Sequence, residues 1–358
     1  MQPLVPTWQN FIKDLLDPGA QKREQDPDIG QRLFTKSEMD LGTTQETAIR
    51  YSSWDHTAKD RQVCSRPSTN PRSETGSHRV YKWTDEKGQT QFSDTRPPGR
   101  VASVIDLSGK KRDFTYEVVP DGITLPVDFQ GKVRAGAKRI YDTWHFFLRE
   151  ENLRQSHITL RVIGGPERFD AFRARSWPNS KPVSGFYNPG LNQAFVKYNP
   201  ARPDQALATS FHEISHLITA SHLGPTPPWL TEGLAEYFET MRVKDQAGTI
   251  YPNRAHINLL KRSVLPPLGD YLEINRSEWN GDQRDLNYAT AWSLTHYLMS
   301  TNHGTYALQQ VVQQSHRNFC KPFSAAGALD GAYPGGIPKL EVDLRKAIKN
   351  EAFPILQK

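Results

Sequence analysis

The sequence predicts an α+β fold, with strands and helices mixed before about residue 223 and mainly helices after it. Short segments between positions 80 and 198 alternate in polarity or run continuously apolar, as strands do. From Pro203 onward, apolar residues recur every three or four positions, as in amphipathic helices. The first 78 residues show neither pattern over any long stretch, and their polar composition contributes to a low hydrophobic content of 36% and a mean hydropathy of −0.67.

Three regions follow from this reading. Residues 1–78 are expected to be mostly disordered, apart from one short amphipathic helix from Thr7 to Leu16. Residues 79–115 are expected to form a small β domain, and residues 116–358 a larger domain that carries the chemistry. A chain of 358 residues has room for two domains and a substantial core.

A β-hairpin is predicted from Val80 to Asp94, where aromatic residues alternate around an Asp-Glu-Lys-Gly turn. This segment resembles a small bacterial envelope domain of unknown function with the pattern Y-x-W-x-D-x-x-G-x-x-x-[FY]-S-D. The aromatic residues are expected to form the core of this domain, in preference to a platform for a ligand.

The larger domain is predicted to begin with a helix over Val127–Glu150, whose apolar residues form a stripe. A strand over Ile158–Ile163 and a hairpin over Pro182–Tyr198, with an Asn-Pro-Gly turn, follow it. Further helices are expected later in the chain, at Arg254–Lys261, Asn287–Ser300, Tyr306–Ser315 and Leu340–Ala352.

The most informative motif is His212-Glu213-Ile214-Ser215-His216, on a helix that should start near Pro203 and stop at Gly224. Because helix positions i and i+4 lie on one face, His212 and His216 can bind one zinc ion. Glu213 is placed to accept a proton from water that the metal activates. The alternative is a buried amphipathic helix with two hydrogen-bonded histidines.

Two residues compete for the third ligand. His222 lies six residues after His216, but that spacing needs a turn glycine where this chain has Thr219. Glu232 lies on a second helix that Pro227-Pro228 should open, and it is preferred. Glu236, one turn further, is expected either to hold the ring of a ligating histidine or to be a solvated carboxylate.

Taken together, HEISH and WLTEGLAEYFE resemble the gluzincins, the thermolysin-like clan of zinc metallopeptidases, and especially their aminopeptidase N and leukotriene A4 hydrolase branch. The nearest pattern is that of a little-characterised bacterial group with HExxH followed by PxWLxEGLAEYFE. The resemblance implies one Zn²⁺ per chain, Glu232 as the third ligand, and a cleft between a strand-bearing lobe and a helical lobe. It also implies that Tyr288 opens a helix and stabilises the oxyanion; a merely packed tyrosine is the alternative.

One departure from that branch concerns the segment before the metal-binding helix. No Gly-x-Met-Glu-Asn motif is present to bind the free amine of a substrate. Gly185, Phe186 and Tyr187 instead belong to the expected hairpin, whose edge can pair with an extended peptide. Internal cleavage of a peptide or protein is therefore expected rather than removal of N-terminal residues.

Charge and cysteine content say little more about function. The net charge of +6 predicts attraction to anionic surfaces such as membranes or cell wall, while no nucleic-acid motif and no transmembrane run is present. Cys64 and Cys320 could form a disulfide. No signal peptide is visible, and only the envelope-type hairpin favours a periplasmic or secreted location. An inactive relative that binds peptide or cell wall, or an assembly factor, remains the alternative function.

Overall fold

The computed structural model describes residues 63–64, 79–84, 90–93, 96, 99, 102–106, 114–149, 152–154, 156–176 and 183–357. The helix expected at Thr7–Leu16 and nearly all of the expected disordered segment lie outside these residues. The Asp-Glu-Lys-Gly turn of the first hairpin also lies outside them. The described part mixes strands and helices, so the α+β class is confirmed.

The main sheet has four strands in the order β4-β5-β7-β6. Strands β4 (Phe114–Asp121), β5 (Ser156–Gly164) and β7 (Gln193–Tyr198) are parallel, and β6 (Gly185–Asn188) pairs antiparallel with β7 at the edge. A tight turn joins β6 to β7, because Asn188 Oδ1 accepts hydrogen bonds from the amides of Gly190 and Leu191. The hairpin expected over Pro182–Tyr198 is thus confirmed.

Helices cover both faces of this sheet. Alternate residues of β7 face opposite sides, so Ala194 and Val196 join the main core while Phe195 joins a smaller cluster on the other face. Helices α4 (Val127–Phe147) and α6 (Pro203–Leu223) contribute to the main core. Helix α5 (Pro166–Ser176) contributes Phe169 to the smaller cluster. Burial on both faces explains the nearly continuous apolar run of β5.

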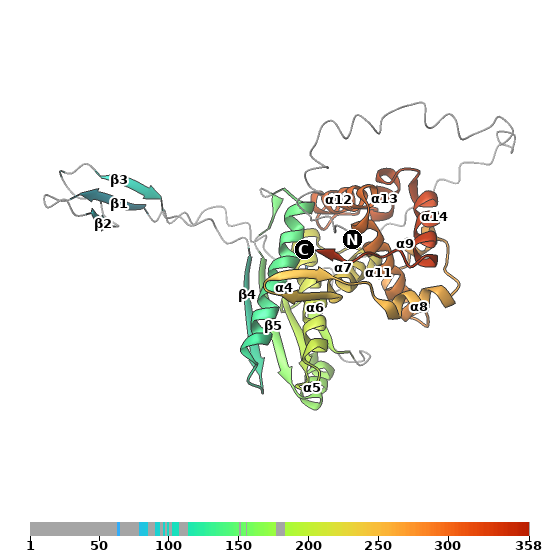
Figure 1. The fold of residues 1–358 in the computed structure, drawn as a ribbon, viewed down its shortest axis with the longest axis horizontal. Helices are drawn as coiled ribbons and strands as arrows, with labels where there is room; N and C mark the ends of the chain where they lie inside the picture. The colour runs from blue at the N-terminus through green and yellow to red at the C-terminus, as the bar shows by residue number, and fades with distance from the viewer. Residues whose placement is uncertain are drawn as a thin grey trace, which may run out of the picture.

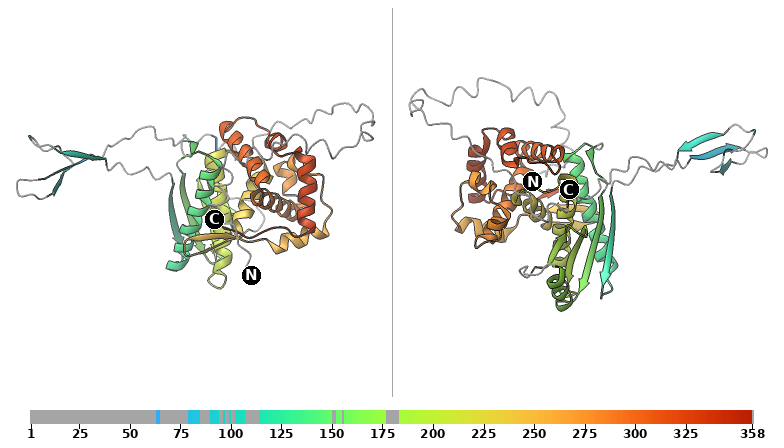
Figure 2. Two further views of the ribbon diagram at one scale, coloured as in Figure 1. Left: turned by 45° about the horizontal axis from the view of Figure 1, so that its top comes forward. Right: turned by 180° about the vertical axis from the view of Figure 1, so that it is seen from behind.

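The second half of the chain is mainly helical. Figures 1 and 2 show the sheet at one end of this part of the chain and the C-terminal helices at the other, with α4, α6 and α7 between them. Strands β8 (Met241–Lys244), β9 (Ala247–Ile250) and β10 (Leu356–Gln357) form a small antiparallel sheet. The helices of this half are α7 (Pro228–Glu239), α8 (Arg254–Arg262), α9 (Leu268–Leu272), α10 (Arg276–Trp279), α11 (Arg284–Ser300), α12 (Asn302–Arg317), α13 (Ala325–Ala332) and α14 (Gly336–Lys349).

The small β domain contains the expected hairpin and one further strand. β1 (Arg79–Thr84) pairs antiparallel with β2 (Thr90–Ser93), and β3 (Ser103–Asp106) pairs with the other edge of β1. Three strands are close to the smallest number that forms a stable sheet in water.

Several element boundaries differ from the sequence predictions. α11 begins at Arg284, so Tyr288 lies in its second turn and does not open the helix as expected. α14 ends at Lys349, before the expected Ala352, because Glu351 has a left-handed backbone with φ 53°. β4 begins at Phe114, two positions before the expected start of the larger domain, and its pairing with β5 places it in the main sheet.

Cys64 and Cys320 form a disulfide, with 5.6 Å between their Cα atoms. It joins a residue near the start of the chain to the segment after α12. Among the described residues, no helix has the length and apolar character needed to span a membrane.

Candidate metal centre

Helix α6 carries two histidines and a glutamate of the candidate site: His212, His216 and Glu213. Pro203 suits its first turn, and Gly224 with φ 71° ends it. The residues on its inner face are completely buried and hold the helix in the core: Phe211, Ile214, Leu217 and Ile218. The opposite face therefore presents His212 and His216 one turn apart, with ring centroids separated by 4.8 Å.

Helix α7 brings the third group. Pro228 occupies its first turn and Trp229 is buried, which sets the angle at which the chain enters the helix. Gly233, next to Glu232, lets α7 approach α11 closely, because a Cβ at this position would lie 2.9 Å from the Ala291 carbonyl oxygen. The glycine of the Thr-Glu-Gly segment thus brings the helices of Glu232 and Tyr288 together.

His212, His216 and Glu232 form a group that could hold a metal ion, since one ligand atom of each lies within 4.8 Å of the others. Glu232 Oε2 lies 3.6 Å from His212 Nε2 and 3.4 Å from His216 Nε2. These distances are too long for good hydrogen bonds, and the buried Oε2 has no hydrogen-bond partner. Ligands about 2.0–2.1 Å from a tetrahedral zinc ion are separated from one another by about 3.3–3.4 Å. The three side chains therefore fit one ion between them.

Glu213 lies beside this group but faces the sheet edge. It is 5% exposed, and its Oε2 has no hydrogen-bond partner. Burial raises the pKa of Glu213, although the charges of His212 and His216 oppose the shift. Strand β6 packs directly on it, since a Cβ on Gly185 would lie 3.0 Å from Glu213 Oε1. A buried carboxylate with a raised pKa is suited to accept a proton.

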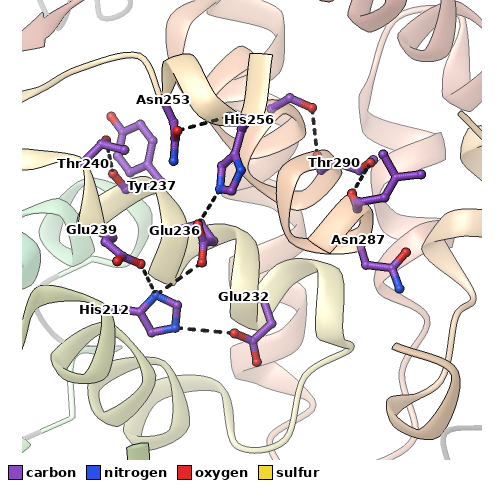
Figure 3. Close-up of polar contacts among 12 residues, drawn as sticks. His212, Glu232, Glu236, Tyr237, Glu239, Thr240, Asn253, His256, Asn287 and Thr290 are labelled. Atoms are coloured by element: carbon purple, nitrogen blue, oxygen red, sulfur yellow. Dashed lines mark hydrogen bonds and ion pairs between the residues drawn. The ribbon is translucent and has the colours of Figure 1, made fainter. Parts of the chain in front are cut away.

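A carboxylate on α7 orients the ring of His212, but it is not the one that was expected. Glu239 Oε2 lies 2.8 Å from His212 Nδ1, whereas Glu236 Oε1 lies 3.6 Å away (Figure 3). Glu236 Oε2 instead accepts a hydrogen bond from His256 Nε2 at 2.8 Å. The role predicted for Glu236, holding the ring of a histidine, therefore belongs to Glu239. Glu239 lies about one turn further along α7 and is closer to the His212 ring.

The electrostatics of His212 agree with this arrangement. Burial lowers its pKa, but its contacts with the Glu232 and Glu239 carboxylates outweigh burial and raise the pKa well above the ordinary value. A cation is therefore favoured at this position. A bound metal would take the place of the proton on the ring nitrogen that faces Glu232.

His256 owes its place to the start of α8. Asn253 caps this helix, and its side-chain oxygen accepts a hydrogen bond from the His256 amide (Figure 3). The ring of His256 then points back toward α7 and holds Glu236. Sequence reasoning missed both His256 and Glu239. For His256 the sequence offered no signal. For Glu239 the only signal was its position seven residues, or about two helical turns, after Glu232.

The rival ligand His222 belongs to the core. It is completely buried, its Nδ1 donates to the Ile218 carbonyl at 3.0 Å, and its ring stacks on Trp144 at 4.9 Å. Burial lowers its pKa to about 4. At its position α6 is still an unbroken helix, so the side chain points away from His212 and His216.

A cleft of about 1110 Å³ contains all the predicted site residues. Edge-strand residues Gly185, Phe186 and Tyr187 line it, as does Tyr288 from α11. Burial, followed by the nearby charge of Glu232, raises the pKa of Tyr288, so its phenol stays protonated as a donor. The Arg284 guanidinium lies 5.1 Å from the Tyr288 ring centroid and packs on it.

Two segments of the chain match protein families whose function is unknown. Residues 76–111 match a family described as "Domain of unknown function (DUF4124)", and residues 206–320 match one described as "Protein of unknown function (DUF1570)". The second segment contains His212, His216 and Glu232 as well as Glu213 and Tyr288. No curated protein and no solved structure matches the chain significantly.

Proposed function

We propose that this protein is a zinc-dependent peptidase of the gluzincin type, with its site in a cleft between a strand-bearing and a helical lobe. The observation that carries the proposal is that ligand atoms of His212, His216 and Glu232 lie within 4.8 Å of one another, and that Glu232 Oε2 has no hydrogen-bond partner. The buried carboxylate of Glu213 beside it supplies a base. A purely structural histidine pair would not require either feature.

The residues of the chain divide the chemistry among them. Zinc bound at the centre supplies a Lewis acid that polarises the scissile carbonyl and acidifies water. Glu213 accepts the proton as water attacks the carbonyl carbon and passes it to the leaving amine. Tyr288 donates a hydrogen bond to the oxygen on which negative charge develops. Glu239 keeps the ring of His212 oriented throughout.

We further propose internal cleavage. β6 is an edge strand that lines the cleft, so it offers main-chain groups to an extended peptide. Among the described residues, the carboxylates that line the cleft are those already assigned to the centre and its neighbours (Glu213, Glu232, Glu236 and Glu239) and Asp285. Asp285 is exposed. A solvated carboxylate binds a free amine weakly, because water screens the pair.

The disulfide supports a location outside the reducing cytosol. Structural disulfides persist in the periplasm and in secreted proteins, and they are rare in the cytosol of mesophiles. The Cys64–Cys320 bond therefore favours export, in agreement with the envelope-type β domain and with a net charge of +6 that suits anionic surfaces.

Elemental analysis of protein purified without added metal tests the metal assignment. We expect one zinc per chain, lost in Glu232→Ala and retained in His222→Phe. Glu213→Gln should keep zinc but lose about 10²–10⁴-fold in hydrolysis of a mixed peptide library. Absence of zinc overturns the proposal. Zinc without hydrolysis in the parent favours the alternative of an inactive peptide- or wall-binding protein.

A pair of peptides tests the cleavage mode. Once a cleaved peptide is known, its N-terminally acetylated form should be cut at the same internal bond and at a similar rate. Stepwise release of single residues, abolished by acetylation, would show an aminopeptidase instead.

A further inference from the structure

One wall of the cleft comes from a residue far away in sequence. Val63 lines the cleft, whereas every other lining residue in the described chain lies at position 183 or later. The α6 end and the turn after it also contribute to the lining, with Ala220 and Pro225 among their residues. Val63 is 8% exposed, so it is packed in place rather than projecting into solvent.

The disulfide holds Val63 in this position. Cys64, its neighbour, is bonded to Cys320, 256 residues later. Cys320 Sγ abuts the same turn, since a Cβ on Gly224 would lie only 3.2 Å from it. The anchor point is itself fixed to α6, because His316 Nδ1 donates to the His222 carbonyl oxygen at 2.8 Å.

Neighbouring contacts strengthen the anchor. The guanidinium of Arg154 lies over the ring of Phe319 at 3.6 Å, directly before Cys320. The ring of Phe319 is also within 3.2 Å of the position that a Cβ on Gly224 would occupy. The segment that receives the disulfide therefore packs against Gly224, which itself lines the cleft.

We propose that Val63 is a specificity-determining residue, placed by the Cys64–Cys320 disulfide to contact an apolar side chain of a peptide in the cleft. The inference rests on the proposed peptidase function. The isopropyl group of Val63 and the side chains of Ala220 and Pro225 make part of the cleft wall apolar. Such a wall favours an apolar substrate side chain, because contact removes apolar surface from water.

The experiment uses the full chain and pairs of peptides that differ by an apolar or a polar residue at one position near the cut bond. Val63→Ala should reduce the apolar preference at one position by about tenfold, as expected for methyl groups lost from an apolar pocket. Removing the disulfide with Cys64→Ser/Cys320→Ser should have the same effect. Adding Val63→Ala to that variant should change nothing further. Val264→Ala, at a site that is 94% exposed, is the matched control.

Two results would overturn the inference. One is an unchanged preference at every position in Val63→Ala, which retains the disulfide and therefore its anchor. The other is a full effect of Val63→Ala in protein that lacks the disulfide, which would show that the bond does not place the side chain.

A readout without hydrolysis separates this inference from the proposed function. Carbene footprinting should show increased labelling of Val63 when the disulfide is removed, because the side chain, 8% exposed in the parent, is then no longer held in place. Unchanged labelling overturns the inference even if the protein is an active peptidase. Increased labelling in a chain that cuts no peptide supports Val63 as a wall of the cleft and overturns only the peptidase assignment.

Discussion

Zinc affinity should depend on Glu239 more than on Glu236. Glu239→Ala removes the carboxylate that accepts the hydrogen bond from His212 Nδ1 at 2.8 Å. Without this acceptor the ring can rotate and is a weaker base toward the metal. Glu236 lies 3.6 Å from the same nitrogen and is already bonded to His256, so its loss should act only indirectly.

The size of the effect follows from the surroundings of Glu239. Loss of a partner that orients a metal-ligating histidine typically costs 10–100-fold in metal affinity. The Glu239 side chain is 37% exposed, so water screens part of its charge and places the effect near the lower end. We therefore expect the zinc dissociation constant to increase about tenfold, or about 1.4 kcal/mol.

Competition with a chelator of known zinc affinity measures this change, and circular dichroism checks that each variant is folded. Glu239→Gln keeps an acceptor oxygen without the charge and should lie between the parent and Glu239→Ala. Glu117→Ala, an exposed site on β4, is the matched control. Parent-like affinity in Glu239→Ala, or a larger loss in Glu236→Ala, would refute the assignment of this role to Glu239.

Three further variants test the site and its supports. Tyr288→Phe should lower kcat by about 10²-fold while zinc content is unchanged, because one oxyanion donor is lost; parent-like kcat would exclude this role. His222→Phe should make the protein less sensitive to acid. The pKa of His222 is about 4 in the folded protein and about 6.5 in the unfolded chain. Between these values only the unfolded chain binds the proton, so the free energy of unfolding of the parent falls as pH falls. Denaturant unfolding should show the parent losing about 2 kcal/mol more than the variant between pH 7 and pH 5; equal losses would contradict the argument. Gly185→Ala would place a Cβ 3.0 Å from the Glu213 carboxylate and should lower kcat/KM by about 10²-fold with zinc retained. Gly131→Ala is the control and should have no effect, because there is open space around this position. Equal kinetics in the two variants would count against the close packing of β6 on Glu213.

Elements with a local cause were predictable from the sequence. The prolines that open α6 and α7 and the glycine that ends α6 act within one helical turn, so these boundaries lie close to the expected positions. The turn between β6 and β7 is likewise closed by its own Asn188. β4 was not predicted, because its place in the sheet depends on pairing with β5, more than 40 residues away.

By itself, the sequence predicted that His212 and His216 lie together with Glu213 beside them, since positions one helical turn apart share a face in any α-helix, and it favoured Glu232 as their partner. Only the tertiary structure decided which carboxylate holds the ring of His212, because Glu236 and Glu239 are both near that face and the crossing of α7 over α6 selects between them. It also decided that His222 is a core residue, and that Val63 and His256 reach the cleft. Their positions depend on a disulfide, a helix cap and close helix packing that join distant parts of the chain, and no local pattern encodes such contacts.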